Sequence, residues 1–273
     1  LYTLYAIACS SSLGSLCWGY NISIISSLRV YLQTTVFPDA SPESISLIAS
    51  FLTAGAAIGS IQGGKFVGTY GRLKTIIYSD ILGIIGCILC MIQYLPFMLI
   101  GRAIGGFLIG LNGVVIGLYN VEMVPIHLKG TMSSISMTFQ AIGNFLSLAA
   151  AFFVPESGVY SNSWRILSGF PIIFHTIRAL VFQYIFHYET PLYLVMNDKV
   201  EEAKEVLGKV YTDNFDKHLD KVFKDKEALA ANGNLTMRDM FSLKYRRAFL
   251  VGISIMVGNQ FCGFSPIFMF FNI

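Results

Sequence analysis

The sequence predicts an all-α protein that crosses a membrane several times. Of its 273 residues, 54% are hydrophobic and only 13% are charged, and the mean hydropathy is +0.62, whereas a soluble domain carries about a quarter of charged residues. The apolar residues are also arranged in blocks. No Asp, Glu, Lys or Arg occurs in residues 1–28, 44–64, 130–155 or 248–273. Because roughly twenty apolar residues are enough to cross a bilayer as a helix, these blocks predict transmembrane helices.

We predict seven membrane spans, at approximately 4–28, 44–66, 75–93, 96–119, 131–154, 166–187 and 248–271. Short loops separate the first six spans. The predicted organisation is a six-span transmembrane half at 1–188, a charged insert at 189–247, and a seventh span at 248–273 that begins an incomplete second half. We expect the sequence to be a piece of a longer protein, because it starts without Met and stops inside an apolar segment.

The insert differs in kind from the spans, since it holds 11 Lys and Arg and 11 Asp and Glu residues. Its apolar residues recur at helical spacing. The two stripes are Val200, Ala203, Leu207 and Val210, then Phe215, Leu219, Val222 and Phe223. Glu205 and Lys209 form an i,i+4 pair on the opposite face of the first stripe. We expect short amphipathic helices that pack on each other beneath the membrane domain, in preference to a docking site for a partner protein.

The basic residues predict the orientation. Arg72, Lys74, Lys129 and the insert all fall on one side of the membrane. Positive charges favour the cytoplasmic side, so we expect an integral multi-pass protein with its insert in the cytoplasm. The sequence does not specify which membrane, and the plasma membrane is our starting expectation.

Glycine spacing predicts which spans pack closely against neighbouring helices. Gly55, Gly59 and Gly63 follow one another at intervals of four in span two, and six glycines crowd span four. Small residues at this spacing allow membrane helices to approach closely.

Six motifs follow one another along the chain. They are Gly14-Ser-Leu-x-x-Gly-Tyr-Asn21, Gly64-Lys-Phe-Val-Gly-Thr-Tyr-Gly-Arg72, Gly101-Arg102, Tyr119-x-x-Glu-x-x-Pro-x-x-x-Lys-Gly130, Tyr188-Glu-Thr-Pro-Leu-Tyr-Leu194 and Gln260-x-x-Gly263. In this order they resemble the sugar porters, the branch of the major facilitator superfamily that includes the facilitative glucose transporters. The resemblance implies the major facilitator fold and the transport of a small sugar, with part of the second half outside this sequence.

The resemblance also implies a set of substrate-binding residues. A sugar needs neutral hydrogen-bonding groups and an apolar wall, and amides offer both a donor and an acceptor. The implied residues are Trp18, Gln140, Asn144, Asn259, Gln260 and Ser265. Met137 stands where the family has its sugar-binding Gln, so that the amide comes one turn later, at Gln140. An alternative for Gln140 and Asn144 is that they bridge helices by hydrogen bonds.

A second implied set controls access to the cavity. Arg72, Glu122, Lys129 and Glu189 match charges that form an ion-pair network at the inner ends of the spans in the family. The network is thinned here. Gly68, Thr69 and Leu73 replace polar or charged residues of the family.

Span seven supplies two further gating candidates. Pro266 lacks the N–H that a helix needs and is expected to kink the span. Phe270 falls where an occluding aromatic residue is found in the family.

Asn21 and Arg102 bear on energy coupling. In proton-coupled sugar porters the position of Asn21 is an Asp that pairs with the Arg at the position of Arg102. An Asn cannot take up a proton in this way, so Asn21 resembles the uncoupled members. The alternative is a proton-coupled symporter that uses Asp80, although we expect Asp80 to lie near the cytoplasmic end of span three and to be structural. His175 and Arg178 depart from the family, and we expect them to pair with a group outside this sequence.

Other classes of protein have little support. The sequence has no clustered basic face for nucleic acid, no phosphate-binding glycine loop and no metal-spaced His or Cys cluster. We therefore expect neither an enzyme nor a bound cofactor, and take a small sugar and the lipid bilayer as the partners. The leading hypothesis is a facilitative hexose carrier. The alternatives are a proton-coupled symporter, or a carrier-like sensor or subunit that no longer transports and belongs to a larger membrane assembly.

Overall fold

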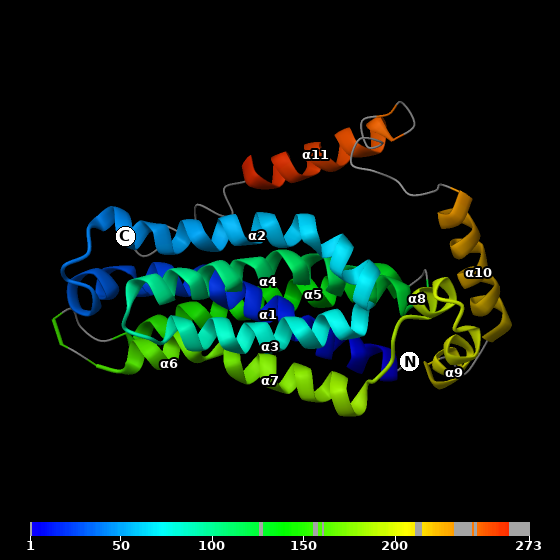
Figure 1. The fold of residues 1–273 in the computed structure, drawn as a ribbon, viewed down its shortest axis with the longest axis horizontal. Coiled ribbons are helices and arrows are strands. Elements are labelled where there is room, and N and C mark those ends of the chain that lie inside the picture. Colours follow the sequence, from blue (N-terminus) through cyan, green and yellow to red (C-terminus); the bar gives the residue numbers. More distant parts are fainter. Residues whose placement is uncertain are drawn as a thin grey trace.

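The computed structural model describes residues 2–125, 128–154, 158–159, 161–210, 215–231, 242 and 245–261, with the backbone alone at 215–217, 229–231, 259 and 260. Within these residues all regular structure is helical, as the sequence predicts. The first five helices are α1 Tyr2–Tyr31, α2 Pro42–Tyr70, α3 Arg72–Cys90, α4 Leu95–Glu122 and α5 Lys129–Ala150. Figure 1 shows these helices side by side along the long axis of the molecule.

The predicted spans two to six are confirmed. The described segments that are long and apolar enough to cross a bilayer are Pro42–Tyr70, Arg72–Cys90, Leu95–Glu122, Lys129–Phe153 and Ser163–Ile185. Helix α1, the predicted first span, is 30 residues long but falls outside this group, because its many serines lower its hydropathy. Helix α11, Arg246–Phe261, covers the first part of the predicted seventh span, and residues 262–271 of that prediction lie outside the described residues.

The sixth span is not one continuous helix. It is divided into α6 Ser163–Gly169, α7 Pro171–Leu180 and a π-helical turn, Val181–Ile185. The division falls at Pro171, which has no N–H to continue the helical hydrogen bonds and whose ring disfavours the preceding turn. The predicted boundaries, 166–187, are close to those observed, but the break was not predicted.

The two glycine-rich spans, α2 and α4, pack closely on each other, a pairing that the sequence did not specify. Side-chain atoms added at Gly55 and Gly59 would strike the backbone of Ala103 and Phe107, and at Gly106 they would strike the backbone of Leu52. Helices α1 and α5 approach one another in the same way, at Gly19 and Gly143. The glycines therefore bring backbones into direct contact.

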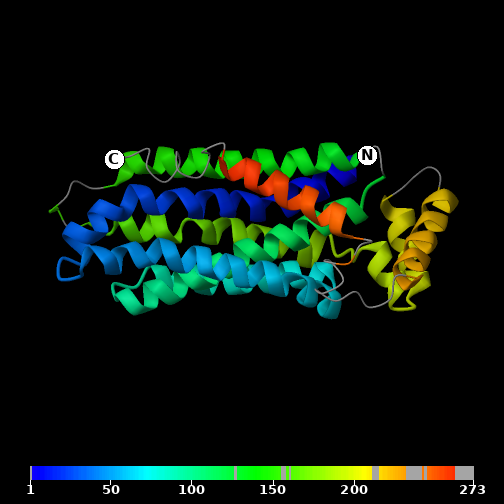
Figure 2. The same cartoon turned by 90° about the horizontal axis from the view of Figure 1, so that it is seen from above.

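The described residues of the insert form three helices at one end of the bundle, beside the start of α1 (Figures 1 and 2). They are α8 Pro191–Met196, α9 Val200–Val210 and α10 Phe215–Ala231. The predicted apolar stripe of α9 is buried at Ala203, Leu207 and Val210, and the Glu205–Lys209 pair is present with an O–N distance of 2.6 Å.

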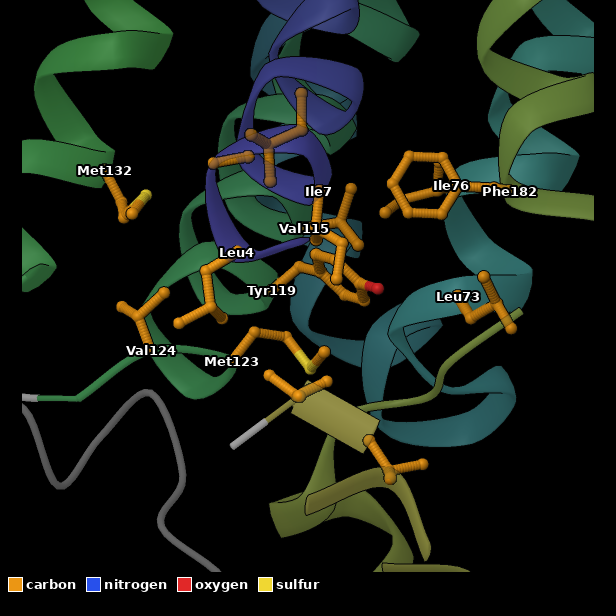
Figure 3. Close-up of a cluster of buried hydrophobic side chains, with 14 of the residues drawn as sticks. Leu4, Ile7, Leu73, Ile76, Val115, Tyr119, Met123, Val124, Met132 and Phe182 are labelled. Atoms are coloured by element: carbon orange, nitrogen blue, oxygen red, sulfur yellow. The ribbon is translucent and has the colours of Figure 1, made fainter. Parts of the chain in front are cut away.

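The insert shares a core with the membrane helices. Ala203, Val206 and Val210 belong to the same buried cluster as Leu73 and Tyr119. Figure 3 shows how α1, α3 and α4 contribute to this cluster. The insert is thus fixed to the end of the bundle by apolar contacts, as expected from its amphipathic pattern.

Helix α11 lies outside the six-span bundle (Figures 1 and 2). Its large apolar side chains are exposed, for example Leu250 at 52% and Met256 at 70%. This exposure shows that α11 packs little against the other described helices.

Candidate functional site

A small, partly open cavity lies within the six-span half. It is lined from α1, α2, α3, α4, α6 and α7, and its polar walls include Trp18, Asn21, Arg102, Asn112 and His175. Its volume of about 20 Å³ is enough for one or two water-sized occupants.

Arg102 and Asn21 meet at this cavity. Arg102 is buried; its Nη2 donates to the backbone oxygen of Asn21 at 2.8 Å, and its Nη1 lies 3.5 Å from the amide oxygen. The Asn21 amide nitrogen donates to the carbonyl of Cys17 at 3.0 Å. Arg102 Nε has no hydrogen-bond partner among the described residues. The two residues therefore occupy the paired arrangement that the resemblance implies, with an amide in place of a carboxylate.

A second polar cluster joins α3 and α7. Arg178 Nε donates to both carboxylate oxygens of Asp80 at 2.9 Å, and His175 Nδ1 lies 2.7 Å from Asp80 Oδ1. Arg178 and Asp80 are fully buried. The expectation that His175 and Arg178 pair with a group outside this sequence is therefore wrong, because Asp80 is their partner.

Further contacts extend this cluster to α1 and α4. Arg178 also donates to the Ser79 hydroxyl and the Asn112 amide oxygen at 3.1 Å, and its Nη1 lies 3.4 Å from the Ser11 carbonyl. One guanidinium thus bridges four helices, and its charge is matched by the Asp80 carboxylate.

The position of Asp80 also needs correction. Because α3 begins at Arg72, Asp80 is near the middle of a 19-residue helix and not at its cytoplasmic end. A signal for the pairing was present in the sequence. Asp80 lies eight residues from the start of α3, and Arg178 lies seven residues before Ile185, the end of the sixth span. Both residues therefore lie at a similar depth from the insert end.

The predicted substrate residues of α1 and α5 do not form one cluster. Asn144 is buried and accepts a hydrogen bond from Ser23 at 3.0 Å, which is the helix-bridging geometry. Trp18 lies beside the small cavity, on the side of α1 that faces α4. Gln140 is half-buried, and its side chain makes no hydrogen bond to a described residue.

The span-seven candidates cannot be placed in the site. Asn259 and Gln260 lie in the last turns of α11, where only the backbone is described. Ser265, Pro266 and Phe270 lie outside the described residues.

Three of the four predicted gating charges lie next to one another in space, at the end of the bundle that carries the insert. Arg72 forms an ion pair with Glu122 at 2.7 Å. The Glu189 carboxylate accepts the backbone N–H groups of Arg72 at 3.0 Å and of Leu73 at 3.1 Å, so that it caps the N-terminus of α3. Burial raises the pKa of Glu189, and the backbone hydrogen bonds and Arg72 oppose this rise.

Gly71 makes the capping contact possible. Its φ is +86°, a conformation that side chains rarely adopt, and an added Cβ would strike the Glu189 carboxylate. The glycine of this loop motif therefore lets two distant segments meet.

Lys129 stands apart from this group. It makes no ion pair with a described residue. Burial and the positive charge of Lys129 lower the pKa of Lys221, a lysine of the insert. The contiguous group therefore consists of Arg72, Glu122 and Glu189.

Comparison with known proteins identifies the family. A family model described as "Sugar (and other) transporter" matches residues 7–271. The chain belongs to this sugar transporter family. Among curated relatives of this family, the plastidic glucose transporter 4 of Arabidopsis thaliana is 26% identical over 96% of this chain. The hexose transporter 1 of Plasmodium knowlesi is 28% identical over the same share.

The match covers 46% of the first of these relatives and 56% of the second, so the chain spans about half the length of the relatives it matches. Solved structures share its fold. The proton:xylose symporter XylE, a major facilitator protein solved with 6-bromo-6-deoxy-D-glucose, superposes with a TM-score of 0.77 at 20% identity over 87% of this chain and 55% of that chain. A partially occluded inward-open form of XylE from E. coli gives the same score over 97% of this chain and 65% of that one.

Proposed function

We propose that the whole protein moves a hexose or a similar small polyhydroxylated solute across a membrane by alternating access, without coupling to protons. The family membership supports transport of a sugar-like solute. Glucose, hexose and inositol transporters are among the relatives of the chain. The observation that carries the uncoupled mode is the contact between Arg102 and Asn21.

The chemistry of this contact favours uniport. A carboxylate beside a cation inside the membrane can gain and lose a proton during a transport cycle. An amide in the same place stays neutral at all physiological pH values. With Asn21 as the polar partner of Arg102, the transport cycle has no proton to carry at this position.

The solute would bind between the two halves. We assign Trp18, Gln140 and Asn144 to this half of the site, and Asn259, Gln260 and Ser265 to the seventh span. Gln140 supports this assignment best, because its half-buried amide makes no hydrogen bond to a described residue and is free to bind a hydroxyl. Pro266 and Phe270 would form the gate of span seven.

The charged group at the insert end would close the inner side. Arg72, Glu122 and Glu189 tie the ends of α3, α4 and the insert together, and Lys129 begins α5. We place the insert in the cytoplasm and the protein in the plasma membrane.

The test is uptake of labelled glucose by the full-length protein in liposomes, with and without an imposed proton gradient. Saturable uptake that is indifferent to the gradient is expected. Gln260→Ala should abolish it, and the matched control Gln183→Ala, an exposed amide in the sixth span, should not. No uptake of any hexose, with purification in a fixed ratio with other subunits, would favour the sensor or subunit instead.

A second candidate is proton-coupled transport through Asp80 and His175. The observation in its favour is the buried cluster of Asp80, His175 and Arg178, in which His175 also lines the cavity. Buried ionisable groups in membrane helices mark proton pathways in many transporters. Accumulation of glucose against its gradient, driven by protons and lost in His175→Gln, would establish this mode and overturn the uncoupled one.

A further inference from the structure

We propose that the small cavity beside Arg102 is a binding site for a monovalent anion of halide size, chloride in the cell, and that this anion is the counter-charge of Arg102. The site lies inside one half of the protein. The inference therefore depends neither on which solute is transported nor on the coupling mode.

The first argument is the charge of Arg102. Its guanidinium is buried in the middle of a membrane bundle, with 4% of the residue exposed. Its hydrogen bonds go to the carbonyl and amide oxygens of Asn21, which carry no net charge. None of the described carboxylates forms an ion pair with it, and its Nε has no hydrogen-bond partner among the described residues. A buried charge without a counter-charge is strongly unfavourable.

The second argument is that the buried carboxylate of the bundle is already engaged. Asp80 receives three short contacts from Arg178 and His175 and does not line the cavity. Its charge is matched by Arg178, which leaves none to compensate Arg102.

The third argument is the chemistry of the cavity wall. The titratable or charged groups that face the cavity are Cys17 on α1, Cys87 and Cys90 on α3, Arg102 on α4 and His175 on α7. None of these groups is a carboxylate, and Arg102 carries a positive charge. Trp18 adds an indole N–H, which is a donor only. The wall thus attracts an anion and repels a cation.

The Asn112 side chain, also on the wall, has its acceptor oxygen occupied. The Asn112 amide oxygen already accepts from Ser79 at 3.3 Å and from Arg178 at 3.1 Å. With a volume of about 20 Å³, the cavity accommodates one or two occupants of water or halide size. Size and charge together select a small monovalent anion.

The test compares salts at equal ionic strength. The full-length protein is purified in detergent, and its thermal unfolding is followed in sodium chloride and in sodium gluconate, whose anion is too large for the cavity. Chloride and bromide should raise the unfolding midpoint saturably over gluconate, since a ligand that binds the folded state stabilises it.

Two variants assign the effect to this cavity. Asn21→Asp places a carboxylate beside Arg102 and should remove the chloride dependence while keeping stability in gluconate. Asn162→Asp adds the same charge at an exposed position next to α6 and should keep the full chloride dependence. Equal chloride dependence in Asn21→Asp and the wild type would overturn the proposal.

Diffraction from crystals of the wild type grown in bromide gives a direct readout that needs no variant to fold. An anomalous peak within contact distance of Arg102 is expected. Water only in the cavity, or bromide at surface positions as an adventitious ion only, would overturn the proposal, as would a wild-type midpoint that is the same in chloride and gluconate.

Discussion

At the residue scale, the interior of the six-span half holds two buried arginines, of which one pairs with a carboxylate and the other with an amide. Arg178 faces Asp80 and spans four helices through its hydrogen bonds. Arg102 faces an amide and a cavity. Since a charge inside a membrane needs compensation, the first arginine is a structural tie, and the second is the one available for a ligand.

Removal of the Asp80 charge should be costly. In Asp80→Asn the Arg178 guanidinium stays buried without a counter-charge, so we expect the free energy of unfolding to fall by about 3–5 kcal/mol. The double variant Asp80→Leu with Arg178→Met should lose less than the sum of the two single changes. Unfolding in a denaturing detergent titration measures both.

The control for this prediction is the exposed pair of Lys226 and Asp198, 2.9 Å apart. Asp198→Asn should change stability little, because exposed pairs contribute little. A fall for Asp198→Asn as large as for Asp80→Asn, or strict additivity of the double variant, would contradict a structural tie at Asp80.

The sequence places Asp80 and Arg178 at a similar depth, but it does not give the pairing itself. It shows that Asp80, His175 and Arg178 are ionisable residues within spans, and hence that each needs a partner. The partners come from helices that are far apart in the chain, since Asp80 and His175 are separated by 95 residues. Whether such residues contact each other depends on which spans are neighbours. By contrast, the contact of Asn21 with Arg102 was implied by the resemblance and is present.

At the scale of elements, packing depends on where glycines allow backbones to touch. The spans, and the fact that spans two and four pack closely, were predictable, because hydropathy and small-residue spacing are local properties of the sequence. That these two spans pack on each other was not predicted. The break of the sixth span at Pro171 was missed although the proline is visible, because many membrane helices accommodate a proline without ending. The sequence predicted that the insert lies beneath the membrane domain, but it did not predict the contacts with Leu73 and Tyr119.

Glycines within one helix should respond differently to the same change. In Gly106→Ala the new Cβ strikes the backbone of Leu52, while Gly117 has open space within 4 Å. We expect Gly106→Ala to lower the free energy of unfolding by about 1–3 kcal/mol. Gly117→Ala should be neutral or raise it by up to about 1 kcal/mol, because alanine favours the helix. Detergent unfolding of the two variants decides, and equal effects would argue against the close crossing of α2 and α4.

The cap of α3 should make stability depend on pH. Burial raises the pKa of Glu189 above its ordinary value of 4.5, so the folded protein binds this proton more tightly than the unfolded chain does. Protonation therefore stabilises the fold, and this contribution is complete below about pH 4.5 and is lost as the pH rises through the raised pKa.

Glu189→Gln lacks this contribution. As the pH rises from about 4.5 through the raised pKa of Glu189, the unfolding midpoint of the wild type should therefore fall relative to that of the variant. Thermal unfolding from pH 4 upward measures it. A difference that stays constant with pH would mean that Glu189 has an unperturbed pKa in the folded protein.

At the scale of the whole molecule, the chain spans about half the length of the curated transporters it matches. Apolar side chains of α5 and α11 are exposed, such as Met137 at 72% and Phe261 at 87%, and such surfaces fit contact with lipid or with further helices. Gln140 lies on the same helix as Met137, so a second half packed there would cover the proposed binding amide. In the proposed transport cycle, the ends of the two halves open and close in turn.

The ion pair of Arg72 and Glu122 offers a test of the inner gate. Both side chains are about 90% buried and lie 2.7 Å apart, so either single change, Arg72→Glu or Glu122→Arg, leaves two like charges facing each other where an attraction stood. If the pair closes the inner side of the carrier, each single variant of the full-length protein should lower the initial rate of glucose uptake in liposomes at least several-fold. The exchanged pair, with both changes together, should recover a large part of the rate, because the attraction is restored with the two charges in exchanged positions.

Lys129→Ala serves as the matched control. Lys129 makes no ion pair with a described residue, so this variant should retain most of the uptake. A double variant no faster than the singles would show that these side chains act through other partners, the Glu189 cap and the Tyr193 ring beneath the Arg72 guanidinium being the nearest.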